Sequence, residues 1–100
     1  MSNPQSPISP QFDVITFGEC MLRFSPPAGQ MLEQADQLRV EPAGTESNTA
    51  VALARLGRRV SWFSLLPDTP LGRWITTRLD SHGVDVSHVI RTGDRVGVFF

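Results

Sequence analysis

The stretch AGTESNTAVALARLG, from Ala43 to Gly57, joins a glycine turn, a cluster of small polar residues and an apolar helical pattern. Gly44 offers a backbone without a Cβ atom, and Thr45 or Ser47 is suited to cap a helix. The alanines, valine and leucines that follow predict a helix that is apolar on most sides, and therefore buried. Gly57 lies where a left-handed C-terminal cap is expected.

The start of this predicted helix allows two interpretations. Its first turn presents free N–H groups and the positive end of the helix dipole beside Thr45, Glu46, Ser47 and Asn48. In one interpretation these polar side chains only satisfy the backbone, as at many loop-to-helix junctions. In the other they bind a polyhydroxylated ligand, because Asn48 offers both a donor and an acceptor. The residues alone leave both interpretations open.

Composition limits the class of protein. The 100 residues are 40% hydrophobic and carry a formal net charge of -1, which is typical of one small soluble globular domain. All nine basic residues are arginines scattered along the chain, so we expect no nucleic-acid partner, and the absence of lysine excludes a GxxxxGK[ST] phosphate loop from these residues. Cys20 is the single cysteine, which excludes an internal disulfide and any zinc site of usual spacing. We expect no membrane association and a cytoplasmic location.

The order of predicted elements indicates an α/β fold. Residues 1–11 are rich in Pro, Ser, Asn and Gln, lack charge and have no long apolar run, so they predict a disordered leader before a domain over 12–100. Apolar or alternating runs predict a buried strand over 12–17 and a half-exposed strand over 38–42. Further strands are predicted over 21–25, 60–66, 84–90 and 96–100. Strands that alternate with helices predict a parallel sheet flanked by helices.

A second, amphipathic helix is predicted after Leu66. Asp68 or Thr69 is the expected cap, Pro70 lies at or near the first helical position, and Gly83 ends the helix. Its apolar face is predicted to contain Leu71, Trp74, Ile75 and Leu79, and its outer face Arg73, Thr76, Thr77 and Asp80.

Two aromatic and two histidine side chains are predicted to be structural. Trp62 and Phe63 lie in a strand and are expected in the core. His82 lies at a helix C-terminus, where an imidazole suits the dipole. His88 is expected in a short strand, with no Cys, Asp or second His at ligand spacing.

Several segments resemble one family of enzymes. The Ala43-Gly44 pair, Asn48, Ala50 and the closing ALARLG resemble the first signature of the ribokinase-like (PfkB) family of carbohydrate kinases. Other matching segments are FGECMLRFSPP from Phe17, LPDTPLGR from Leu66, GVDVSHV from Gly83 and TGDRVGVFF from Thr92. Together they look most like the 2-keto-3-deoxygluconate kinase branch. The resemblance implies the N-terminal part of a ribokinase-like parallel sheet flanked by helices, with short strands that form a lid over the sugar.

The resemblance also implies an activity. Family members transfer the γ-phosphoryl group of ATP, with Mg²⁺, to a primary hydroxyl of a keto-sugar or keto-sugar acid, here 2-keto-3-deoxygluconate. The catalytic Asp, the GAGD-like anion hole, and the ATP and Mg²⁺ sites are expected beyond Phe100, so this fragment would carry acceptor-binding residues only and no metal site. Alternatives are a fructokinase or another ketose kinase, or a truncated sugar-binding module without transfer chemistry. The full-length protein is also a candidate homo-oligomer.

The resemblance assigns substrate contacts to three places. One is the run that holds the sugar acid, Gly44, Thr45, Glu46, Ser47 and Asn48. Phe99 falls where close relatives often have Tyr, so the aromatic wall is kept and a hydroxyl is lost. Arg23 is either the outward residue of an exposed strand or a partner for the carboxylate of an acidic sugar, which its planar guanidinium suits.

Overall fold

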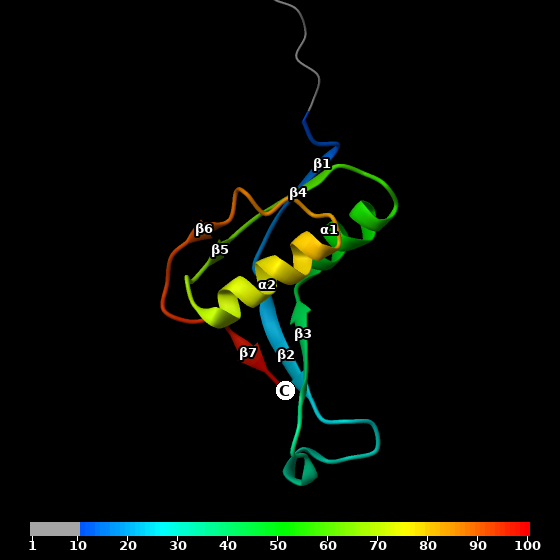
Figure 1. Cartoon of the computed structure of the whole chain (residues 1–100), viewed down its shortest axis with the longest axis vertical. Helices are drawn as coiled ribbons and strands as arrows, with labels where there is room; N and C mark the ends of the chain where they lie inside the picture. The colour runs from blue at the N-terminus through cyan, green and yellow to red at the C-terminus, as the bar shows by residue number, and fades with distance from the viewer. Residues whose placement is uncertain (1–10) are drawn as a thin grey trace, which may run out of the picture.

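The computed structural model describes residues 11–100, which form two helices, a short 3₁₀ helix and seven short strands (Figure 1). Except for Gln11, the predicted leader lies outside the described residues. The elements in chain order are β1 (Val14–Phe17), β2 (Met21–Ser25), η1 (Leu32–Gln34), β3 (Arg39–Ala43), α1 (Thr45–Arg55), β4 (Val60–Phe63), β5 (Leu65–Leu66), α2 (Pro70–Ser81), β6 (Ile90–Arg91) and β7 (Val98–Phe99).

The strands form three small sheets. β1 pairs in parallel with β4, and β5 pairs in parallel with β6. The third sheet has the order β3-β2-β7, with β2 antiparallel to β3 and parallel to β7. Figure 1 shows the β2–β3 hairpin reaching away from the two helices. Strand β1 precedes α1 in the chain and β4 follows it, and the two strands pair in parallel. This arrangement confirms the predicted α/β class.

The core lies between the two helices and the strands they cover. Its largest fully buried side chains include Trp62 of β4, Leu22 of β2, and Ile75 and Leu79 of α2. Truncation of a buried aromatic such as Trp62 costs about 3–5 kcal/mol, so this one side chain matters greatly for stability. Trp62 is therefore a core residue, as predicted, whereas Phe63 is only partly buried.

Neither helix in the described part of the chain has the length and apolar character needed to cross a bilayer.

Helix α1 is less buried than its sequence predicts. Only Ser47 and Ala50 of this helix are buried, and Leu56, just after it, is 78% exposed. The prediction of a buried helix is wrong because the β1–β4 sheet beneath α1 has only two strands and covers one side of it. Gly44 is the N-cap and no side chain caps the helix, so the prediction of a Thr45 or Ser47 cap is also wrong.

Strand β1 is open on one face. Ile15 and Phe17 are 59% and 76% exposed, and Val14 and Thr16, which alternate with them, are partly buried. The predicted buried strand is therefore wrong for half of its side chains. Helix α1 packs against β1 and β4, and no second layer within residues 11–100 covers Ile15 and Phe17.

Helix α2 begins and ends as predicted. The hydroxyl oxygen of Thr69 accepts a hydrogen bond from the backbone N–H of Gly72 at 3.2 Å, Pro70 is the first helical residue, and Gly83 has a φ of 92°. Asp68 does not cap the helix but forms an ion pair with Arg73 at 2.8 Å.

The predicted faces of α2 need two corrections. Leu71 is 43% exposed, and Thr76 is buried with 6% exposure. Thr76 tolerates burial because its hydroxyl donates to the Arg73 carbonyl at 3.1 Å and accepts from Arg91 Nη2 at 2.7 Å. Leu71 lies in the first turn of α2, where it lines a hollow together with Val96 and Val98.

Two predicted strands are broken. The predicted strand over 60–66 is interrupted at Ser64, which separates β4 from β5. The predicted strand over 84–90 keeps only an isolated bridge between Ser61 and Asp85 before β6 begins at Ile90. The backbone of Asp85 still bonds to Val60 and Trp62 of β4, at 2.9 and 3.0 Å. Its carboxylate accepts hydrogen bonds from the Ser61 and Ser87 hydroxyls, at 2.8 and 2.9 Å, and the local Ser87 bond favours a turn over further sheet pairing.

His88 consequently lies in a turn and not in a strand. Its ring stacks on Phe63 with centroids 4.6 Å apart, and its Nδ1 atom lies 3.2 Å from Asp85 Oδ2. The expectation that no Asp lies near His88 is therefore wrong. The role remains structural, because His88 covers Phe63.

Candidate functional site

The candidate site lies where the parallel strands β1 and β4 end. Their carboxyl ends share one edge, where a hollow of about 270 Å³ is lined by Phe17, Gly18, Glu19, Ser64 and Leu65. Ligands of open parallel α/β sheets bind outside this edge. The Glu46 carboxylate, in the first turn of α1, occupies the space in which a Cβ atom at Gly18 would lie. The first turn of α1 therefore lies beside this hollow.

Gly44 allows the start of α1 to lie close to the segment that follows β1. A Cβ atom at this position would collide with the Glu19 carbonyl oxygen and lie 3.3 Å from the Cα atom of Cys20. The φ of Gly44 is -177°, which any residue adopts, so glycine is needed here for space and not for conformation. This contact joins the helix start to the edge of the β1–β4 sheet.

The next three predicted site residues differ in what they offer a ligand. Ser47 is fully buried, and its hydroxyl donates to the Gly44 carbonyl at 3.1 Å. Thr45 is exposed, and its carbonyl accepts the Thr49 hydroxyl at 2.8 Å. Glu46 is partly exposed beside Gly18. The side chains of Thr45 and Glu46 are therefore accessible to solvent, whereas Ser47 fixes the turn.

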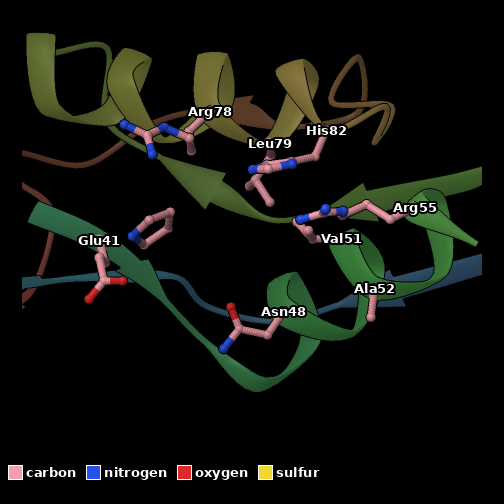
Figure 2. Close-up of a pocket in the computed structure, with 9 residues that line it drawn as sticks. Glu41, Asn48, Val51, Ala52, Arg55, Arg78, Leu79 and His82 are labelled. Atoms are coloured by element: carbon pink, nitrogen blue, oxygen red, sulfur yellow. The ribbon is translucent and has the colours of Figure 1, made fainter.

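Asn48 points elsewhere. Its backbone N–H donates to the Gly44 carbonyl at 2.9 Å, but its exposed side chain lines a groove between α1 and α2, near Glu41 (Figure 2). Asn48 is not part of the lining of the hollow at the ends of β1 and β4. The structure thus separates the Asn48 amide from the edge that Glu46 and Gly44 approach.

Arg23 and Phe99 are brought together by the three-stranded sheet. Arg23 of β2 is paired in register with Glu41 of β3 on one side and with Phe99 of β7 on the other. Cross-strand partners share one face of a sheet, so the three side chains form one row. Arg23 Nη2 donates to Glu41 Oε1 at 2.7 Å, and this hydrogen bond holds the pKa of the Glu41 carboxyl below its ordinary value.

This row lies close to the start of α1. Met21, two residues before Arg23, pairs with Ala43, the residue directly before Gly44. Arg23 and Phe99 are exposed, so their face is open to a ligand. Of the predicted site residues, Gly44 and Glu46 contact the segment after β1, and Arg23 and Phe99 lie in one row of the sheet whose strand β3 leads into Gly44. Ser47 is buried and Asn48 faces the groove.

Sequence reasoning missed three residues at this end. Glu19 and Cys20 contact the start of α1, and Glu41 pairs with Arg23. The charge of Glu41, opposite to that of Arg23, identifies it as a partner only once the two strands are known to be neighbours. Cys20 is 2% exposed, and burial raises the pKa of its thiol. A buried neutral thiol packs as a small apolar group, which explains why no sequence signal marks it.

A second cluster has catalytic residue types but not catalytic geometry. Ser61 Oγ lies 3.3 Å from His88 Nδ1, and Asp85 Oδ2 lies 3.2 Å from the same nitrogen. A Ser-His-Asp relay uses two different ring nitrogens, and Ser61 is fully buried. This cluster therefore anchors the turn to β4. Within residues 11–100, no three His, Cys, Asp or Glu side chains gather closely enough to hold a metal ion.

Comparison with known proteins gives a consistent result. Residues 11–100 match the family described as pfkB family carbohydrate kinase. A 2-dehydro-3-deoxygalactonokinase of Haloferax volcanii is 53% identical over 73 residues, which are 73% of this chain and 23% of the relative. A 2-dehydro-3-deoxygluconokinase of Bacillus subtilis is 42% identical over 84 residues, 84% of this chain and 26% of the relative.

A solved structure supports the same relationship. The 2-dehydro-3-deoxygluconokinase of Thermotoga maritima superposes with a TM-score of 0.82 at 39% identity, over 85% of this chain and 26% of that protein. The chain thus spans about a quarter of the length of the relatives it matches.

Proposed function

Because the chain belongs to the pfkB family of carbohydrate kinases, we propose that it supplies the acceptor-binding part of an ATP-dependent and Mg²⁺-dependent sugar kinase. The reaction transfers the γ-phosphoryl group to a primary hydroxyl of a keto-sugar or keto-sugar acid, with 2-keto-3-deoxygluconate as the leading candidate. The names of the Haloferax and Bacillus relatives support a 2-keto-3-deoxy sugar acid. A free, buried Cys20 is compatible with a cytoplasmic location.

The observation that carries the proposal is the position of the Gly44 turn. It places the start of α1 against the Glu19–Cys20 segment, at the edge of the parallel sheet where ligands bind. Thr45 and Glu46 offer side-chain groups to sugar hydroxyls there, and Ser47 holds the turn. Asn48 would contribute its amide once its side chain turns from the groove toward the sugar.

The three-stranded sheet supplies the other wall. We assign Arg23 to the carboxylate of a sugar acid, because a planar guanidinium matches a carboxylate and only one of its donors is bonded to Glu41. Phe99 gives an apolar surface beside it. A wall of this kind excludes water, which in a kinase suppresses hydrolysis of the nucleotide.

Residues 11–100 do not fit the groups that would perform the transfer. They offer no cluster of carboxylates for Mg²⁺ and no lysine for a nucleotide phosphate. We therefore derive no phosphoryl-transfer step from this chain. Its residues position the acceptor, and correct positioning is itself a large part of catalysis by kinases.

The acceptor class is tested by exchanging Arg23. The full-length protein, of which this chain supplies the acceptor-binding part, is assayed with ATP, Mg²⁺ and a panel containing 2-keto-3-deoxygluconate and fructose. We expect Arg23→Gln to raise the KM for the sugar acid about tenfold, as lost charge-assisted hydrogen bonds do, and to leave the KM for fructose unchanged. Arg39→Gln, which changes an exposed arginine of the neighbouring strand β3 in the same sheet, is the matched control.

Three results would point elsewhere. A preference for fructose that survives Arg23→Gln favours a ketose kinase, which the Phe99 ring without a hydroxyl also fits. Binding of a sugar by calorimetry without phosphorylation indicates a non-catalytic sugar-binding module. Failure of every sugar to bind overturns the proposal.

A further inference from the structure

A groove of about 450 Å³ runs between α1 and α2 (Figure 2). From α1 it is lined by Asn48, Val51, Ala52 and Arg55, spaced i, i+3, i+4 and i+7 on one helix face, and from α2 and its C-cap by Arg78, Leu79 and His82. Glu41 and Pro42 of β3 complete it. Its volume is within the range of small-molecule sites and is too small for a folded partner.

The charges of the groove favour an anion. Arg55, Arg78 and His82 enter it from two different helices. In the described part of the chain, neither Arg55 nor Arg78 forms an ion pair, although Arg78 lies over the Trp74 ring at 4.6 Å. The one acidic group of the lining, Glu41, is bonded to Arg23 outside the groove.

Helix dipoles explain only part of this arrangement. Arg55 and Arg78 lie in the last turns of α1 and α2, where a positive charge is favourable at the surface of any protein. The dipole effect accounts for one cation at each helix end. It does not require both cations and an imidazole to line one hollow that has an apolar floor of Val51 and Leu79.

We propose that the groove binds a small anionic ligand, a sugar-sized molecule with a phosphate or carboxylate group, at its Arg55 end. Arg55 is seven residues after Asn48 along α1, about 10 Å at the rise of an α-helix. The anion is therefore held away from the Gly44 turn, in a site separate from the acceptor site. Arg55 and Arg78 bind the charged group, and Val51 and Leu79 contact the body of the ligand.

The test is a calorimetric titration of the protein at low ionic strength with four probes. Inorganic phosphate and gluconate separate phosphate from carboxylate binding, 6-phosphogluconate carries both groups, and glucose carries neither. We expect 6-phosphogluconate to bind and glucose not to bind. Arg55→Gln and Arg78→Gln each weaken binding at least tenfold, whereas Arg58→Gln, a matched change of an exposed arginine outside the groove, changes it less than twofold.

Binding at the acceptor site is separated by Phe99→Ala, which removes a proposed acceptor contact that does not line the groove and leaves the groove titration unchanged. The inference is overturned if no anion binds, if Arg55→Gln binds as tightly as the unaltered protein, or if Arg58→Gln weakens binding equally. Sugar phosphorylation is measured in parallel. Phosphorylation without groove binding overturns only this inference, and groove binding without phosphorylation overturns only the proposed kinase activity.

Discussion

Gly44 is the residue whose replacement we expect to damage the candidate site most directly. A Cβ atom at this position meets the Glu19 carbonyl, which is backbone and cannot move aside cheaply. We expect Gly44→Ala to lower the free energy of unfolding by about 1–3 kcal/mol, as overpacking does. Urea unfolding measures the change, with the exposed Thr45→Ala as a control that shifts it by less than about 0.5 kcal/mol. Equal urea midpoints for Gly44→Ala and the unaltered protein would contradict the expected collision.

Asp85 links stability to pH. Partial burial raises the pKa of its carboxyl, but hydrogen bonds with Ser61, Ser87 and His88 together outweigh burial and leave the pKa below its ordinary value of 3.8. A carboxyl whose pKa is lower in the folded than in the unfolded state stabilises the fold above the unfolded pKa. That stabilisation is lost as the pH falls through the folded pKa. We therefore expect unfolding to become easier as the pH is lowered from about 5 to below the folded pKa.

Replacement of Asp85 tests this assignment. We expect Asp85→Asn to cost about 1–3 kcal/mol at pH 7, because the Ser61 hydroxyl is buried and loses a charged acceptor. The variant should also lose part of the acid dependence, which thermal unfolding between pH 3 and 7 measures. Asp80→Asn, on the exposed side of α2, serves as the control. An unchanged acid dependence in Asp85→Asn would assign the effect to other carboxylates.

At the residue scale, the sequence predicts what depends on neighbours in the chain. Gly57 and Gly83 have φ values of 90° and 92°, and Thr69 is a cap, each as its local pattern indicates. The Arg23–Glu41 pair and the Asp85 cluster depend on which segments become neighbours in space. No local pattern specifies that, so these two contacts were not predicted.

The cap of α2 makes a prediction at the scale of an element. The Thr69 hydroxyl satisfies the N–H of Gly72, one of the free donors at the helix start. We expect Thr69→Ala to lower the free energy of unfolding by about 0.5–2 kcal/mol. Chemical unfolding checks the value, and Thr77→Ala on the exposed face of the same helix is the matched control. A loss no larger than that of Thr77→Ala would mean that the cap contributes nothing.

Element types were predictable, but burial was not. Helix α1 has the helical period, yet its alanines fit exposed and buried faces alike, so the pattern cannot say which side the two-stranded sheet covers. The same applies to β1, where Ile15 and Phe17 are apolar but exposed. The predicted strand over 84–90 is reduced to one bridge because only Asp85 exchanges backbone hydrogen bonds with β4, and the next residues form a turn in which the Ser87 hydroxyl bonds the Asp85 carboxylate.

At the scale of the whole molecule, exposed apolar side chains form what we call the outer patch: Ile15, Phe17, Leu65 and Ile90. Phe17 and Leu65 line one hollow, and Leu65 and Ile90 are register partners, so the patch is continuous. Continuous apolar surface of this kind promotes association. We expect the hundred-residue chain to self-associate as its concentration rises, which light scattering measures.

Paired substitutions locate that association. Ile15→Thr combined with Phe17→Ser should lower the average mass in solution by at least half, because the outer patch loses its two β1 side chains. Leu56→Thr removes an exposed leucine that lies away from the patch and should change nothing. A chain that stays monomeric at every concentration would show that the outer patch does not drive association.

The candidate site could be predicted only in part at this scale. The resemblance identified the Gly44 turn, and the structure joins Arg23 and Phe99 in one row near it. The orientation of Asn48 toward the groove could not be predicted, because it depends on how α2 lies beside α1. The groove itself brings together residues from positions 41 to 82, and no single segment contains its pattern of charges.

Strand β3 ends at Ala43 and α1 begins at Thr45, so Gly44 alone connects them. Because no loop separates the strand from the helix, the backbone of Gly44, which has no side chain, sets the angle between them. A change in the direction of β3 would therefore also change the direction of α1. Because α1 forms one wall of the groove and β3 contributes Glu41 and Pro42 to it, the three-stranded sheet and the groove are joined at this one residue.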